Sequence, residues 1–144
     1  MIFDESVNVL APEKDEGVPK KLIDYSVVKK GINAPSMKPK DKKEAKNILL
    51  KLSGKTHFVI TGVTIRNKEK HFTFQDKTEV TFNELSDSEI DSYLKTNDAM
   101  DKAGAYGIQD WIGMIGVQKI NGSYTNVMGL PTSKLFPAIN KFTL

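Results

Sequence analysis

HFVITGVTIRNKEKHFTFQDKTEVTF, residues 57–82, is the stretch that decides the fold. Its first nine residues are rich in β-branched types, and the polar residues Arg66–Lys70 that follow can turn the chain. Apolar residues then occupy alternate positions in two stretches, at Phe72 and Phe74 and at Val80 and Phe82. Such alternation is typical of strands with one buried face. The stretch therefore predicts two antiparallel strands, Val59–Ile65 and Thr73–Phe82.

Helix signals lie on both sides of this pair. Asp41 can cap a helix near residues 41–53, in which apolar residues recur at helical spacing (Ala45, Ile48, Leu49 and Leu52). The sequence Ser86-Asp87-Ser88-Glu89 is a capping box and predicts a helix near residues 87–95.

The two ends of the chain are harder to interpret. Residues 112–120 and 123–127 are predicted strands, with Asn121-Gly122 as the hairpin turn between them. Pro131 can open a last helix, which Pro137 should kink or shorten. Before Asp41 we expect one strand at residues 21–28 and otherwise loop. Helices that alternate with antiparallel pairs indicate one mixed α/β (α+β) domain over residues 1–144, of which 1–35 form a divergent or truncated N-terminal part and 36–144 the remainder.

Composition excludes several classes of protein and site. No apolar run approaches the roughly 18 residues of a membrane-spanning helix, and the start lacks the pattern of a signal peptide. The chain has no cysteine, which excludes disulfides and thiolate metal sites and fits a cytoplasmic protein. His57 and His71 are the only histidines, so any metal must be held mainly by oxygen ligands.

Charge is distributed unevenly along the chain. The net charge is +3, the first residues are acidic, and residues 20–55 are rich in lysine. Such a basic stretch can attract polyphosphate or nucleic acid, or it can simply be a solvated surface. The lysines are not interleaved with aromatic residues, which argues against a nucleic-acid-binding module.

The segment Asp101–Gln109, DKAGAYGIQ, carries the most chemical information. Its glycines allow close approach of the backbone, and the carboxamide of Gln109 can donate and accept hydrogen bonds, as the edge of a nucleobase requires. The alternative is a plain glycine-containing loop in which Asp101 only caps a turn. Trp111 has two interpretations, a core or pocket-wall residue or a base-stacking platform, and we expect the first. His57 is expected to be a hydrogen-bonded structural residue.

Several segments together resemble the Maf family of nucleotide pyrophosphatases. DKAGAYGIQ is similar to a signature of that family. Others follow in the family's order: KPKD at 38–41, LSGKTH at 52–57, VITGV at 59–63, TEVTF at 78–82, ELS at 84–86 and NVMGLP at 126–131. Each motif is weak alone, but their common order over residues 36–136 is highly specific.

The resemblance implies a Maf/inosine-triphosphatase-like fold and a nucleoside triphosphate as substrate. Family members hydrolyse the bond between the α and β phosphates with the help of a divalent metal cation, Mg²⁺ or Mn²⁺. The form DKAGAYGIQ is similar to the subgroup that acts on thymidine and uridine triphosphates (dTTP and UTP). The resemblance places Lys38 near the phosphates, Gln109 at the base, and Asp101 and Lys102 in the substrate site. Family members are often dimers, so a homodimer is an alternative to a monomer.

The sequence also departs from the family pattern. The family's first strand and its Ser-x-Ser-Pro-Arg-Arg phosphate loop have no counterpart in these residues, and Arg66 is the only arginine. Asp24, in LIDYSVV, aligns with the family's general base and metal ligand only after a small insertion, with Tyr25 in place of threonine. Asp110 and Trp111 replace the small residues often found after the glutamine. We therefore expect a truncated member with impaired hydrolysis, or a catalytically inactive remnant that still binds nucleotides.

Overall fold

The computed structural model describes residues 3–7, 24–32 and 38–143, and for the first two of these ranges it describes the backbone alone. Five strands form one sheet in chain order: β1 (Phe3–Val7), β2 (Asp24–Ile32), β3 (Thr56–Arg66), β4 (His71–Phe82) and β5 (Val117–Asn121). All four pairings between these strands are antiparallel. The predicted class, an α/β domain with a largely antiparallel sheet flanked by helices, is confirmed.

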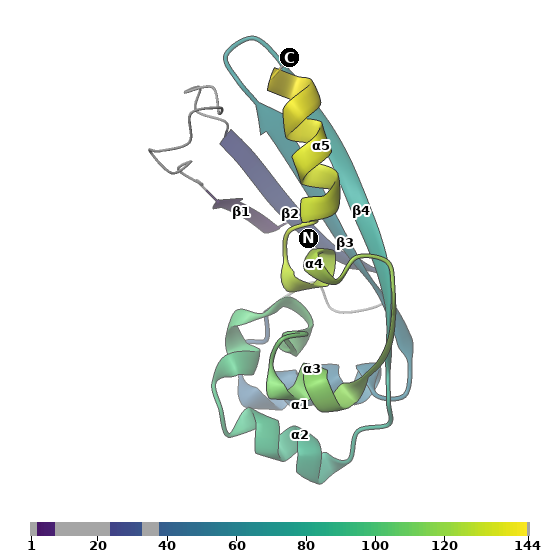
Figure 1. Cartoon of the computed structure of the whole chain (residues 1–144). Helices are drawn as coiled ribbons and strands as arrows, with labels where there is room; N and C mark the ends of the chain where they lie inside the picture. The colour runs from purple at the N-terminus through teal and green to yellow at the C-terminus, as the bar shows by residue number, and fades with distance from the viewer. Residues whose placement is uncertain (1–2, 8–23, 33–37, 144) are drawn as a thin grey trace.

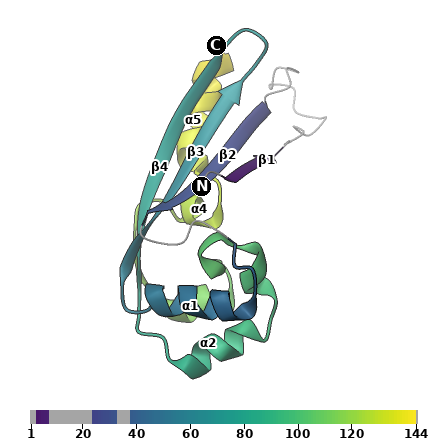
Figure 2. The same ribbon diagram turned by 180° about the vertical axis from the view of Figure 1, so that it is seen from behind.

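The helices divide between the two ends of this sheet. Along the chain they are α1 (Lys42–Leu52), α2 (Asp87–Leu94), the 3₁₀ helices η1 (Asp98–Asp101) and η2 (Ala103–Ala105), α3 (Trp111–Gly116), α4 (Tyr124–Met128) and α5 (Thr132–Thr143). Figure 1 shows α1, α2 and α3 gathered at one end of the strands, α5 lying along the sheet at the other end, and α4 between them. The reverse view in Figure 2 shows the same division. Within the described ranges, no helix combines the length and the apolar character needed to cross a bilayer.

The two helix starts predicted from the sequence are confirmed. The Asp41 side chain accepts a hydrogen bond from the Glu44 amide at 2.7 Å and caps α1. At α2 the capping box is complete, because the Ser86 hydroxyl accepts from the Glu89 amide while the Glu89 carboxylate accepts from the Ser86 amide. Both caps satisfy amides that have no partner within the helix.

The predicted C-terminal hairpin is wrong on both sides of Asn121-Gly122. Residues 111–116 form α3, so that the strand begins only at Val117. A β-carbon at Gly113 would lie 2.3 Å from the carbonyl oxygen of Ile108, so only glycine lets α3 pack this closely on the preceding backbone. After β5 the chain enters α4 instead of a returning strand, because the Ser123 side chain caps that helix by accepting from the Asn126 amide.

Three smaller expectations also differ from the structure. The strand predicted at residues 21–28 is found as β2, displaced to 24–32, and residues 21–23 lie outside the described ranges. A strand, β1, occupies Phe3–Val7 where loop was expected. Pro137 lies within α5 and does not end it, since the helix continues to Thr143, while the predicted kink stays a prediction.

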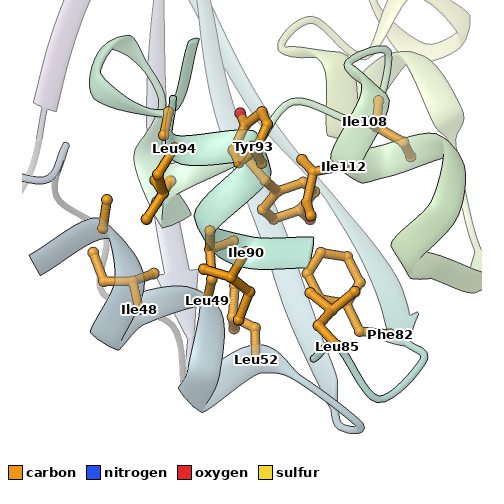
Figure 3. Close-up of a cluster of buried hydrophobic side chains, with 14 of the residues drawn as sticks. Ile48, Leu49, Leu52, Phe82, Leu85, Ile90, Tyr93, Leu94, Ile108 and Ile112 are labelled. Carbon is orange, nitrogen blue, oxygen red and sulfur yellow. The ribbon is translucent and has the colours of Figure 1, made fainter. Parts of the chain in front are cut away.

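Two hydrophobic clusters lie on different parts of the sheet. The larger joins α1, α2, the end of β4 and the segment leading into α3. Figure 3 labels several of its side chains (Ile48, Leu49, Leu52, Phe82, Leu85, Ile90, Tyr93, Leu94, Ile108 and Ile112). The smaller joins Val63 and Ile65 of β3 to Leu135, Ala138 and Phe142 of α5. One sheet therefore supports two cores, and the candidate site is built on the larger.

An ion pair fastens α5 to the sheet. The buried Asp76 carboxylate of β4 lies 2.7 Å from Nζ of Lys134, which also donates to the Gln75 carbonyl at 3.3 Å. A buried carboxylate needs such a partner, because an unpaired charge away from water is costly.

The larger core provides a direct test of the packing. Leu49 is fully buried and its neighbour Leu50 is 41% exposed. We expect Leu49→Ala to lower the free energy of unfolding by about 2–5 kcal/mol through loss of buried surface and a residual cavity. Leu50→Ala, the same chemical change one residue away, should cost less than about 1 kcal/mol. Urea unfolding measures both, and equal losses would contradict the assigned face of α1.

Candidate functional site

The family-like segment 101–109 lies in the chain between α2 and α3. It begins at the end of η1, passes through η2 and ends one residue before Asp110, which precedes α3. The two 3₁₀ helices pack against α1, and η2 also contacts β2. In Figure 2 this segment lies beside α1, at the helical end of the molecule. Residues 98–109 are thus two short 3₁₀ helices and the loop that follows them.

Lys102 contacts residues on both sides of this segment. Its Nζ donates to the carbonyl of Asp98 at 2.9 Å and lies 3.0 Å from Oδ2 of Asp110. The same carboxylate oxygen accepts a hydrogen bond from the Tyr93 hydroxyl of α2 at 3.2 Å. We call Tyr93, Lys102 and Asp110 the Lys102 clamp. Because its charged side chains are only 28% and 16% exposed, water screens this pair less than it would a surface pair.

Gly107 makes room for the clamp. A β-carbon there would lie 2.6 Å from Oδ2 of Asp110 and 2.8 Å from Cε of Lys102. Real β-carbons do not approach other atoms so closely, so a side chain at this position would displace the ion pair. The glycine is therefore needed for the protein's own packing at this point.

Tyr93 is a stable donor within the clamp. Its side chain is almost completely buried among the residues of the larger core. Burial raises the pKa of its hydroxyl above the ordinary value of 10.0, and the negative charge of Asp110 raises it further. The hydroxyl therefore keeps its proton at neutral pH and can donate it to the carboxylate.

A second polar contact anchors the middle of the segment. The hydroxyl of Tyr106 lies 2.7 Å from Nε2 of His57 at the start of β3, and both residues are buried. The Phe82 ring meets each of them edge to face, with centroids 5.3 Å from His57 and 4.8 Å from Tyr106. The expected structural role of His57 is confirmed. Its Nδ1 is buried and has no protein partner.

The backbone between these two anchors is strained. Ala105 has φ of 62°, and among the described residues it is the only residue other than glycine with positive φ. Alanine in this region costs on the order of 1 kcal/mol, and such strain persists only where surrounding contacts impose it. Here the Tyr106–His57 contact holds the residue that follows Ala105.

The predicted substrate-binding residues fall into two environments. Lys38, Asp101 and Gln109 are exposed, whereas Lys102 is half-buried in the clamp. Lys38 precedes α1, and the other three lie in the segment that packs against α1. That these four residues form one substrate site, as the family resemblance implies, stays a prediction.

Asp24 lies far along the sheet from this segment. It pairs with Arg66 at the first residue of β2, whereas Ile32 at the other end pairs with Phe58, next to His57. The eight-residue separation corresponds to about 26 Å of strand. The structure describes only the backbone at Asp24, so its role as general base and metal ligand stays a prediction.

Sequence reasoning missed the partners within the clamp. The sequence places Tyr93 only within a predicted helix, and it marks Asp110 only as a departure from the family pattern. No spacing rule connects Lys102 to Asp110 across a loop, so only the folded chain shows the pair. Trp111, expected to be core or pocket wall, is 48% exposed at the first position of α3. Trp111 is therefore not a core residue, since the buried residues of α3 are Ile112, Gly113 and Gly116. Its role as a pocket wall stays a prediction.

Comparison with known proteins agrees with these motifs. A profile of the family described as Maf-like protein matches residues 4–142. The chain belongs to the Maf family. A protein named dTTP/UTP pyrophosphatase from Phocaeicola vulgatus is 55% identical over 104 residues, which cover 72% of this chain and 54% of the relative. Proteins of the same name from Cytophaga hutchinsonii and Bacillus cytotoxicus are each 53% identical, over 48% and 54% of their lengths. The chain thus spans about half the length of the curated relatives it matches.

The described side chains do not supply a metal site. Within residues 38–143, no three acidic or histidine side chains gather closely enough to hold an ion. The carboxylate of Asp110 is already shared by Lys102 and Tyr93. A metal at this protein would therefore depend on the phosphates of a ligand and on residues such as Asp24.

Buried His57 should make stability depend on pH. Burial lowers its pKa from 6.5 to about 4, so the unfolded chain binds this proton more readily than the folded one. The contribution of the neutral His57 ring to the free energy of unfolding is complete above pH 6.5. It is lost as the pH falls toward 4, which lowers that free energy by up to about 3 kcal/mol. We expect the unfolding free energy of wild type to fall more steeply over this range than that of His57→Gln.

The matched control is His71→Gln, which removes an exposed imidazole from the first residue of β4. Urea unfolding at a series of pH values gives the three profiles, and NMR titration follows the His57 ring directly. A His57 titration midpoint above pH 6 would contradict the assignment of a buried neutral imidazole.

Proposed function

We propose that this protein is a nucleotide pyrophosphatase that acts on dTTP or UTP, adding water across the bond between the α and β phosphates to release the monophosphate and pyrophosphate. The observation that carries the proposal is the intact DKAGAYGIQ segment, which presents Gln109 as an exposed carboxamide beside an ordered ion pair. The names of relatives that are 53–55% identical support the same substrate class.

In this proposal the two ends of the substrate meet different residues. Gln109 reads the base, because one carboxamide can both donate to and accept from a uracil or thymine edge. Lys38 supplies positive charge for the phosphates, on the lysine-rich approach to α1. Asp24 removes a proton from the attacking water. A divalent cation, Mg²⁺ or Mn²⁺, belongs to the proposal as a group that neutralises phosphate charge.

The second candidate is a nucleotide-binding protein that does not hydrolyse its ligand. Arg66 is the only arginine of these 144 residues, and it pairs with His71 in the β3–β4 register, at the opposite end of β3 from His57. It is therefore remote from the 101–109 segment and does not substitute for the family's double-arginine loop. Preorganised donors around a triphosphate supply several kcal/mol of transition-state stabilisation, and scattered lysines do not replace them.

Location and assembly complete the proposal. A cytoplasmic protein fits the absence of cysteine, and a homodimer fits the habit of the family. A nucleic-acid partner is not part of the proposal. The lysines at 42, 43 and 51 of α1 are exposed, as on any solvated helix face, and Lys46 is paired with Asp91 at 2.7 Å.

Pyrophosphate release tests the activity. We expect the 144-residue polypeptide to hydrolyse dTTP and UTP far more slowly than a member with the double-arginine loop, with Mg²⁺ or Mn²⁺ present. Asp24→Asn should lower any turnover by about 10²-fold or more, as for loss of a general base. Fast turnover abolished by Asp24→Asn would exclude the inactive-remnant candidate. Fast turnover unaffected by it would place the general base on another residue.

Base recognition is tested separately from hydrolysis. Trp111 is the only tryptophan and lies two residues from Gln109, so its fluorescence reports ligand binding at this segment. We expect Gln109→Ala to reduce the preference for UTP over CTP by about 5- to 10-fold, the effect of about one hydrogen bond. Gln118→Ala, which changes an exposed glutamine of β5, is the matched control. An equal effect of both changes would remove Gln109 from the site.

A further inference from the structure

The Lys102 clamp holds the residue next to the proposed base reader. Asp110 follows Gln109 directly, and its carboxylate is held by Lys102 at 3.0 Å and by the Tyr93 hydroxyl at 3.2 Å. Its amide donates to the Gly107 carbonyl at 3.1 Å, which closes the turn that contains Gln109. The Asp110 carbonyl in turn accepts from the Met114 amide and starts α3. Both the side chain and the backbone of Asp110 are therefore fixed, while Gln109 remains exposed.

We propose that Tyr93 and Asp110 are positioning residues for base recognition: together with Lys102 they fix the Gly107–Asp110 turn and thereby aim the carboxamide of Gln109. This inference rests on the proposed function, since Gln109 is taken as the group that reads the base. Neither Tyr93 nor Asp110 touches the nucleotide in this proposal. Their contribution is to reduce the number of directions in which the turn can present Gln109.

The charges of the segment support this division of roles. Over residues 98–110, which include the segment and the flanking residues that Lys102 contacts, Lys102 is the only cation and the three aspartates are anions, so the local charge is negative. Two of the three N–H donors of Lys102 already serve Asp98 and Asp110. An acidic segment with its lysine engaged suits the uncharged base of a nucleotide better than its phosphates. Lys102 thus acts in the clamp and is not a phosphate ligand.

The support beneath the clamp is rigid. Tyr93 belongs to the larger core and is 2% exposed, so its hydroxyl is delivered from packed helix α2 and not from a mobile surface side chain. Gly107 leaves the space that the ion pair fills. These contacts are all made between groups of the protein itself, as preorganisation requires.

The first arm of the test needs no nucleotide. Amide hydrogen exchange followed by NMR should show the Asp110 and Met114 amides exchanging about 5-fold faster in Tyr93→Phe than in wild type, and faster still in Asp110→Asn. Tyr124→Phe, an exposed tyrosine of α4, is the matched loss of a hydroxyl and should leave both rates unchanged. Equal rates in wild type and Tyr93→Phe would overturn the inference, whatever the protein binds.

The second arm asks whether Tyr93 acts through Gln109. The preference for a non-hydrolysable UTP analogue over the CTP analogue is measured by Trp111 fluorescence in wild type, Tyr93→Phe, Gln109→Ala and the double variant. We expect Tyr93→Phe to lower the preference for the UTP analogue about 3- to 5-fold in the wild-type background. In the Gln109→Ala background the same change should have no further effect.

The outcomes separate the two proposals. A wild-type protein without preference for the UTP analogue would refute the proposed base recognition, and with it the specificity role of the clamp. A wild-type preference that Tyr93→Phe leaves intact, or lowers equally in the Gln109→Ala background, would overturn the positioning role alone. A purely structural role of Tyr93 would move stability but would not give the non-additive effect on base preference.

Discussion

Residues 56–66 and 71–82 pair along the whole length of β3 and β4, and both hydrophobic clusters are built on this ladder. One end supports α1, α2 and the family-like segment, and the other supports α5. A long, twisted antiparallel pair exposes more apolar surface than a single helix can cover, so each end has its own cover. The candidate site depends on the first end, where His57 of β3 holds Tyr106.

The chemistry of the segment follows from where its charges lie. A lysine in a family signature invites the interpretation of a phosphate ligand, but Lys102 is directed at Asp98 and Asp110. An ammonium engaged in a partly buried ion pair cannot be recruited by a ligand without leaving Asp110 uncompensated, which costs more than the loss of a surface pair. Lys38 and Gln109 are exposed and lie outside the clamp, and in the proposed function they are the groups assigned to the phosphates and the base.

The sheet also sets the geometry that a hydrolase mechanism must satisfy. The backbones of Asp24 and Arg66 are paired at one end of β2 and β3, and the Tyr106–His57 contact lies at the other end. A substrate whose nucleobase is bound at Gln109 and whose attacking water is activated at Asp24 would have to extend along this strand. Electrostatic stabilisation acts over short distances, so the positions of charges along β2 and β3 decide whether the fold catalyses hydrolysis or only binds.

The sequence by itself determined the features that depend on neighbours in the chain. The alternation in residues 57–82 predicted β3 and β4, and the caps at Asp41 and Ser86 predicted α1 and α2, because these signals act within a few residues. The order of the family motifs likewise led to the Maf family. Only the tertiary structure decided that residues 111–116 are helical, since Gly113 packs on the Ile108 carbonyl. It also decided the role of Lys102, because Asp110 pairs with it across a loop and Tyr93 of another helix donates to Asp110. No sequence period connects these three residues.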